Sequence, residues 1–256
     1  MTLSTTRYFI ELAYDGTSFH GWQIQPNAVS VQELLDRALS TCFRTPVQTT
    51  GCGRTDTGVH ATRFFAHFDL PESIGRAEQQ VHAVNALLPY QIGVKRIFAV
   101  QADAHARFDA TSRTYHYFIH TRKDPFRHQR SWLLRDELNL AAMNEAASRL
   151  FHHTDFSCFS KSNTQTFTNN CRISEAVFTA LPDNGLQFTI SADRFLRNMV
   201  RAIVGTLADV GRAKLSADAF DQIIESRNRS NAGQSVPACG LYLVNITYPY
   251  VNEWQQ

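Results

Sequence analysis

The side chains best suited to chemistry lie in one glycine-rich stretch, Gly51-Cys-Gly-Arg-Thr-Asp-Thr-Gly-Val-His60. Three glycines there surround one guanidinium, Arg54, and one carboxylate, Asp56. A dinucleotide-binding G-x-G-x-x-G motif would need glycine in place of Asp56, and a Walker loop would need Gly-Lys-Ser/Thr, so neither nucleotide motif fits. Two interpretations are open: a loop that holds Asp56 for reaction, or an ordinary turn in which Asp56 accepts a local hydrogen bond.

A second stretch, from Arg107 to Arg135, combines basic and aromatic side chains. Against two acidic residues it has seven basic ones: Arg107, Arg113, Arg122, Lys123, Arg127, Arg130 and Arg135. The rings interleaved with them are Tyr115, Tyr117, Phe118, Phe126 and Trp132. Cations that pair with phosphates, beside rings that stack on unpaired bases, are typical of RNA recognition. The alternative is a half-buried strand whose rings face the core and whose charges face water.

Three further arginines, Arg194, Arg197 and Arg201, have the spacing i, i+3 and i+7. In a helix over residues 193–210, which the pattern predicts, they lie on one face. A solvated helix face would account for them, and so would an arginine directed at a buried carboxylate.

The composition argues against a disulfide framework, a metal centre and a membrane span. The five cysteines include no C-x-x-C pair, so reduced thiols are expected. His152 and His153, with Asp155 nearby, are joined by no further well-spaced ligand and form no H-E-x-x-H pattern, so we expect no metal. Neither a secretory leader nor eighteen consecutive apolar residues are found, and we expect a cytoplasmic protein that does not enter the membrane.

The elements that must position these residues follow the order βαββαβ twice. The first set is a strand at 7–14, a helix at 31–43 opened by the Ser30–Glu33 capping box, strands at 46–50 and 62–69, a helix at 75–88 and a strand at 93–100. The second set is a strand at 113–120, a helix at 140–151 capped by Asn139, strands at 172–180 and 185–191 around the turn Pro182–Gly185, a helix at 193–210 and a strand at 241–248, with an extra helix at 217–227. This order predicts an α+β fold of two ferredoxin-like domains, residues 1–104 and 105–256.

With these motifs in place, the sequence resembles the TruA family of tRNA pseudouridine synthases over nearly its whole length. The stretches that carry the resemblance, in order along the chain, are Tyr14–Gly16, Phe19–Gln23, Gly53–Ala61, Phe108–Tyr115, Phe195–Arg201 and Pro237–Leu243. The sequence departs from the family pattern at Thr57, where alanine is usual, and at Arg197-Asn198, where histidines are common.

The resemblance implies a role for each matched residue. Asp56 is expected to be the catalytic aspartate, Arg201 its partner and Tyr115 the ring that stacks on the target base. Arg54 is expected to help displace that base, and Leu241 to form a wall of the pocket. Independently of the resemblance, the composition of the basic stretch leads us to expect that Arg107 and Arg113 contact the substrate.

The resemblance also implies the fold and the substrate. The expected fold has mostly antiparallel sheets that adjoin, with a basic cleft between the domains, in a homodimer. The expected reaction converts uridine to pseudouridine at positions 38 to 40 of the tRNA anticodon arm. Because this isomerisation adds no atoms and transfers no electrons, no cofactor is expected.

Two other functions are compatible with the residues. An RNA uridine methyltransferase would use Cys52 as its nucleophile, although no loop for a methyl donor is evident. A non-catalytic RNA-binding module would use the same basic and aromatic side chains, since ferredoxin-like sheets also bind RNA without altering it.

Overall fold

The computed structural model describes residues 5–71, 73–161, 167–182 and 184–251 of the chain. The chain forms two compact units: unit 1 is Met1–Thr111 with Leu243–Gln256, and unit 2 is Ser112–Tyr242. The expected domain boundary after residue 104 stays a prediction. Both units are mixtures of helices and mostly antiparallel strands.

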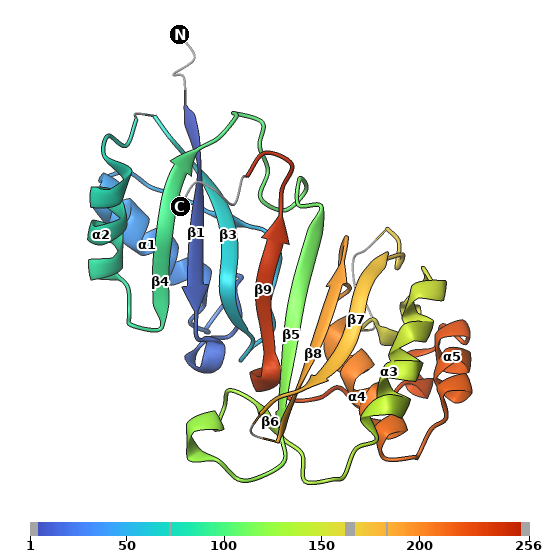
Figure 1. The fold of residues 1–256 in the computed structure, drawn as a ribbon. Helices are drawn as coiled ribbons and strands as arrows, with labels where there is room; N and C mark the ends of the chain where they lie inside the picture. The colour runs from blue at the N-terminus through green and yellow to red at the C-terminus, as the bar shows by residue number, and fades with distance from the viewer. Residues whose placement is uncertain (1–4, 72, 162–166, 183, 252–256) are drawn as a thin grey trace. The chain divides into compact units, whose positions relative to one another are not determined.

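Unit 1 contains a sheet whose strands are hydrogen-bonded in the order β4-β1-β3, with β2 beside β3. All of these pairs are antiparallel. Its elements are β1 (Thr6–Tyr14), α1 (Val31–Phe43), β2 (Thr50–Gly51), β3 (His60–Leu70), α2 (Ala77–Leu87) and β4 (Ile92–Ala99), shown in Figure 1. Except for β2, these elements confirm the predicted positions to within two residues.

The two faces of this sheet differ in chemistry because successive side chains on a strand point to opposite sides. On the helix-covered face, the ring of Tyr8 stacks on that of Phe68 with centroids 5.8 Å apart, and Phe43 of α1 stacks on Phe68 at 6.0 Å. On the other face, the buried carboxylate of Glu11 lies 3.0 Å from Arg63 Nε and 2.6 Å from Arg96 Nε. The helix face is thus an apolar core, and the other face contains a paired charge cluster.

Helix α1 starts where the capping box predicted, because the Ser30 hydroxyl accepts a hydrogen bond from the Glu33 N–H at 3.3 Å. The predicted strand at 46–50 is wrong for most of its length. Instead of pairing with a strand, the N–H of Val47 donates to Ser40 Oγ at 2.9 Å and the N–H of Thr49 donates to Asp36 Oδ1 at 3.0 Å. The segment therefore binds to side chains of α1, which leaves only β2 as strand.

Unit 2 contains antiparallel strands in the order β5-β8-β7, and β6 runs parallel to β5. Its elements are β5 (Ser112–His120), β6 (Trp132–Leu133), α3 (Leu140–Arg149), β7 (Ile173–Ala180), β8 (Gly185–Ala192), α4 (Met199–Gly211) and α5 (Ala217–Glu225). The Asn139 side chain caps α3 by accepting from the Ala142 N–H at 3.0 Å, as predicted. Between β7 and β8, Asn184 has the left-handed backbone conformation of a tight turn, while Asp183 lies outside the described residues.

The predicted helix at 193–210 begins six residues later than expected. Helix α4 starts at Met199, and the residue before it, Asn198, has a φ of 69°. Because a left-handed residue interrupts an α-helix, Arg194 and Arg197 lie outside α4 and only Arg201 lies on it. The single basic helix face predicted for the three arginines is therefore wrong.

The last strand, β9 (Leu241–Thr247), crosses the boundary of the units: its first two residues belong to unit 2 and the others to unit 1. In unit 1 the side chain of Asn245 accepts a hydrogen bond from Arg63 Nη1 at 3.0 Å. Among the described residues, no helix combines the length and apolarity needed to cross a membrane.

Candidate active site

The glycine-rich stretch forms a loop between β2 and β3 in unit 1. Its backbone is fixed at several points: the N–H of Cys52 donates to the carbonyl of Phe65 at 2.8 Å, and the N–H of Val59 donates to that of Asp56 at 3.1 Å. Asp56 is half-buried and Arg54 is exposed. The loop thus holds a carboxylate partly out of water and a guanidinium at the surface beside it.

Two glycines outside the loop allow the chain to pack against its backbone. A Cβ atom at Gly16 would clash with the carbonyl oxygen of Val59. Gly21, which has a φ of 84°, lies equally close to the carbonyl oxygen of Thr55. A hydrogen bond of 2.9 Å between Tyr14 Oη and Thr55 Oγ1 adds a side-chain contact. These contacts make the loop a rigid support for the side chain of Asp56.

A small cavity of about 120 Å³ opens beside the loop, within unit 1. It is lined by Trp22, Gln23, Gln32, Thr49, Thr50, Gly51, Gly53, Arg54 and Arg107. Gln32 is fixed in it, because its amide Nε2 donates to the Thr49 carbonyl at 2.7 Å and its Oε1 accepts from the Ile24 N–H at 3.1 Å. The cavity brings together two of the arginines that the sequence singled out, Arg54 and Arg107.

Arg107 is presented by a turn that hydrogen bonds hold. The imidazole Nδ1 of His105 accepts from the N–H groups of Arg107 and Phe108 at 3.1 and 3.2 Å, and the carboxylate of Asp109 accepts from the His105 N–H at 2.7 Å. Beneath this turn, Nδ1 of His67 accepts from a backbone N–H at 3.1 Å, and burial lowers the pKa of His67 to about 4. A neutral His67 therefore supports the turn at physiological pH, and the side chains of Arg107 and Phe108 are exposed.

In unit 2, Tyr115 lies on β5 opposite Ile190 of β8. Its half-buried ring meets that of Phe195 edge-on, with centroids 5.1 Å apart and an interplanar angle of 90°. Arg113, two residues earlier, donates from Nη1 to the carbonyl of Asp193 at 2.7 Å. Tyr115 therefore presents a ring whose orientation is fixed by a neighbouring aromatic side chain.

Arg201 lies in the first turn of α4 and is half-buried. Its Nε donates to the carbonyl of Val236 at 2.7 Å, and the N–H of Val236 donates back to the carbonyl of Arg201 at 3.3 Å. Leu241, the first residue of β9, is buried, and it follows Gly240, whose Cα lies against the ring of Tyr117. Val236 and Tyr117, the contacts of Arg201 and Gly240, both belong to unit 2.

The predicted site residues thus divide between the units. Asp56, Arg54 and Arg107 lie in unit 1, and the unit 2 residues are Tyr115, Arg113, Arg201 and Leu241. The pairing of Asp56 with Arg201, and the stacking of a base on Tyr115, stay predictions.

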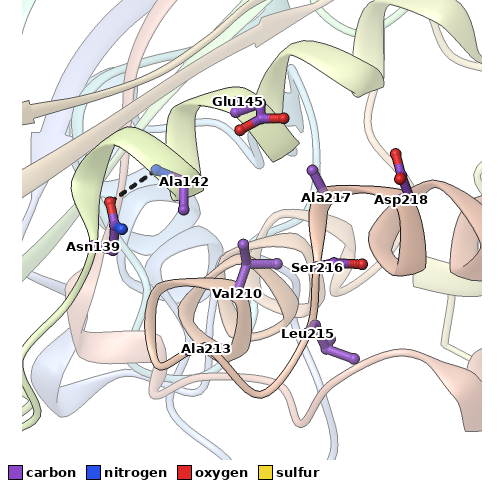
Figure 2. A pocket seen from close by; sticks show the side chains of 9 residues that line it. All are labelled: Asn139, Ala142, Glu145, Val210, Ala213, Leu215, Ser216, Ala217 and Asp218. Carbon is purple, nitrogen blue, oxygen red and sulfur yellow. Dashed lines mark hydrogen bonds between the residues drawn. The ribbon is translucent and has the colours of Figure 1, made fainter.

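A larger cavity, of about 320 Å³, lies in unit 2 between the ends of α3, α4 and α5 and contains none of the predicted site residues. Figure 2 shows the carboxylates of Glu145 and Asp218 among its lining side chains. None of the described residues that line it is basic. This described lining supplies two carboxylates, one of which pairs with Arg149 at 3.3 Å, and no cation, so it offers phosphate no direct partner.

The sequence also singled out the histidine pair at 152–153 and Cys52. His153 Nε2 lies 2.6 Å from Asp221 Oδ1, and no cluster of three or more His, Cys, Asp or Glu side chains suited to a metal occurs in the described part of the chain. The thiol-bearing Cys52 is 1% exposed.

Two residues of the smaller cavity, Gln32 and Thr49, were not predicted from the sequence. Nothing in their local sequence shows that a side chain of α1 will reach that loop.

The sequence of this chain is similar to those of known tRNA pseudouridine synthases. Residues 146–249 match a family model described as tRNA pseudouridine synthase. The tRNA pseudouridine synthase A of Bacteroides fragilis is 52% identical over 247 residues, covering 96% of this chain and 98% of the relative. That of Parabacteroides distasonis is 53% identical over 243 residues, covering 95% and 96%. That of Bacillus subtilis is 39% identical over 241 residues, covering 93% and 97%, so the similarity extends over nearly the whole chain.

Proposed function

Because the chain belongs to the TruA family of tRNA pseudouridine synthases and isomerises uridine in tRNA, we propose that its targets are positions 38 to 40 of the anticodon arm. The alternative functions, a methyltransferase that uses Cys52 and a non-catalytic RNA-binding module, are less well supported. A buried thiol is poorly placed to attack a base.

The proposed architecture is two ferredoxin-like domains, 1–104 and 105–256, whose adjoining sheets flank a basic cleft, in a cytoplasmic homodimer. The strand pairing within unit 1 supports the first domain. Its order β4-β1-β3, with β2 on the far side of β3, is that of a βαββαβ fold in which the two helices cover one face. In unit 2 the order β5-β8-β7 agrees with the same plan.

Asp56 is proposed as the catalytic aspartate. The reaction breaks the bond between uracil N1 and ribose C1′, turns the uracil and forms a bond between C5 and C1′. The C5 proton leaves and N1 gains a proton, so atoms and electrons balance without a cofactor. A carboxylate beside the sugar can attack it, stabilise its positive charge or remove a proton.

Arg201 is proposed as the partner of Asp56, since a guanidinium can form paired hydrogen bonds to a carboxylate. Tyr115 is proposed to stack on the flipped uracil, with Leu241 as a wall of the same pocket. The edge-on contact of Tyr115 with Phe195 supports this role, because it restricts the orientation of the ring. Flipping a base costs a few kcal/mol, which stacking partly offsets.

Arg54, Arg107 and Arg113 are proposed to contact the RNA. Arg54 would help to displace the target base, because it lies two residues from Asp56 and is exposed. Arg107 shares a cavity with Arg54 and is held by the turn at His105. Guanidinium groups match phosphate oxygens in pairs, which makes arginine suited to this contact.

The observation that carries the proposal is the rigid loop that supports a half-buried Asp56. The test is Asp56→Asn, which keeps the volume and removes the charge. Incubated with unmodified tRNA and no cofactor, wild type should form pseudouridine, and the variant should form none while binding tRNA as well as wild type or better. Asp103→Asn, an exposed acidic residue of unit 1, is the matched control and should retain activity.

Three other outcomes would refute the proposal. Conversion by Asp56→Asn at near the wild-type rate would exclude Asp56 as the catalytic group. Wild-type protein that binds tRNA and never converts it would favour the binding module. A gain in RNA mass that requires an added methyl donor would favour the methyltransferase.

A further inference from the structure

A segment of unit 2, residues 229–236, packs along α4 and is here called the Arg229 segment. The N–H of Gly233 donates to Thr206 Oγ1 of α4 at 2.9 Å. Gly205 of α4 lies so close to the segment that a Cβ atom there would clash with the carbonyl oxygen of Gln234. Close backbone packing and hydrogen bonds thus fix the segment on the helix that carries Arg201.

One side chain, that of Arg229, holds this segment in shape. Its Nη1 donates to the carbonyls of Ala232 and Gly233 at 3.3 and 3.2 Å, and its Nη2 donates to Ser235 Oγ at 3.0 Å. Ser235 Oγ also accepts from Nδ2 of Asn198, the residue that precedes α4, at 2.6 Å. Arg229 therefore connects three points of the segment and, through Ser235, the residue that precedes α4.

The segment in turn determines where the guanidinium of Arg201 points. Its Nε donates to the carbonyl of Val236 at 2.7 Å. Because the Nε–H bond lies in the plane of the guanidinium, holding its direction restricts the orientations that both Nη groups can take. A shift of Val236 would therefore turn the Nη groups of Arg201.

We propose that Arg229 is a positioning residue for Arg201, and that it acts on uridine isomerisation without touching the RNA. This inference rests on the proposed role of Arg201 as the partner of Asp56. Lysine could not replace Arg229 fully, because one ammonium cannot reproduce the two planar nitrogens that bind three separate acceptors.

The test separates the chemical step from tRNA binding. With enzyme in excess over tRNA, Arg229→Ala should lower the single-turnover rate by about 10- to 100-fold, since misplacing a catalytic group by about 1 Å costs on the order of 100-fold. The tRNA dissociation constant should change by less than about threefold, because Arg229 does not contact the RNA. Arg229→Lys should recover part of the rate.

Arg227→Ala is the matched control. Arg227 lies two residues away, pairs with Asp155 at 3.2 Å and is exposed, and its removal causes the same loss of charge. It should leave both the rate and the affinity close to wild type. Equal rate losses in Arg227→Ala and Arg229→Ala would attribute the effect to charge and overturn the proposal.

Two further variants separate this inference from the proposed function. If Arg201→Met keeps the wild-type rate, the role of Arg201 fails, and the present inference fails with it. If Arg201→Met is slow while Arg229→Ala is as fast as wild type, only the positioning role is wrong. Should Arg229→Ala fail to fold, Ser235→Ala removes the link to Asn198 with a smaller change, and an unaltered single-turnover rate in that variant would refute the proposal.

Discussion

The orientation of the side chains around the candidate site depends on contacts with residues that are distant in the sequence. Tyr115 is oriented by Phe195, 80 positions later in the sequence, and Arg201 by the carbonyl of Val236. Asp56 owes its position to backbone contacts of the loop with Gly16 and Gly21. The chemical groups are thus recognisable in the sequence, whereas their orientation depends on long-range packing.

Tyr115 is expected to act through its ring. Tyr115→Phe keeps the ring and should retain most of the activity. Tyr115→Ala removes the stacking surface, which is worth about 1 to 3 kcal/mol per base, and should lower kcat/KM on tRNA by about 5- to 150-fold. Steady-state kinetics of both variants provide the measurement. Losses of equal size would show that the hydroxyl, as a proton carrier, is the group that matters.

Among the elements, those with local signals were the most predictable. Side-chain caps at Ser30 and Asn139 predicted the starts of α1 and α3, because the hydrogen bond that caps a helix is made within three residues. The strand predicted at 46–50 and the early start of α4 were wrong. In the first segment, the hydrogen bond from the Thr49 N–H to the side chain of Asp36 prevails over local strand propensity. In the second, the left-handed backbone conformation of Asn198 prevents an earlier start of the helix.

Asp36 of α1 gives a prediction on stability. Burial raises its pKa to about 6, and hydrogen bonds from Thr49 only partly oppose this. Since the folded state favours the protonated carboxyl, the contribution of Asp36 to stability is present below pH 4 and is lost as the pH rises through 6. Asp36→Asn keeps an acceptor for Thr49 and removes the charge, so it should stabilise the protein at pH 7.

The expected gain is about 1 to 2 kcal/mol, less than the full value of a two-unit shift because water screens the part of the carboxylate that is exposed. Thermal unfolding at several pH values provides the measurement: Tm of Asp36→Asn should exceed that of wild type by a few degrees at pH 7, and the difference should disappear towards pH 4. Asp103→Asn, on the surface, should show no such trend. A lower Tm for Asp36→Asn at pH 7 would contradict the prediction.

At the scale of the whole molecule, the sequence was sufficient to predict the reaction. It was not sufficient to predict the geometry of the site. The glycine-rich loop with Asp56 is contiguous, and so its resemblance to the family could be read directly. The proposed site also needs Tyr115 and Arg201, which belong to another unit and lie 59 and 145 positions further along the chain. No local pattern places such residues in space, and none marks Arg229, whose contacts depend on how its segment folds onto α4.

The distribution of cations predicts how tRNA binding responds to salt. Each phosphate that the protein neutralises contributes a slope of about −0.7 to −0.9 to log K against log salt concentration. Arg107→Gln should therefore make the slope shallower by about that amount, because the exposed Arg107 is proposed to contact a phosphate. Arg37→Gln, which changes an exposed cation on α1, should leave the slope unaltered. Binding titrations between about 50 and 200 mM salt test this, and identical slopes for wild type and Arg107→Gln would remove Arg107 from the RNA interface.

The glycine contacts at the loop also bear on how the protein could be redesigned. Gly16 and Gly21 support the loop through its carbonyl oxygens, which every amino acid possesses. The shape of the loop therefore depends little on which side chains occupy positions 54, 56 and 57. These positions can be exchanged, singly or together, to install a different functional group at a fixed place, whereas a larger residue at 16 or 21 would displace the loop whatever it carried.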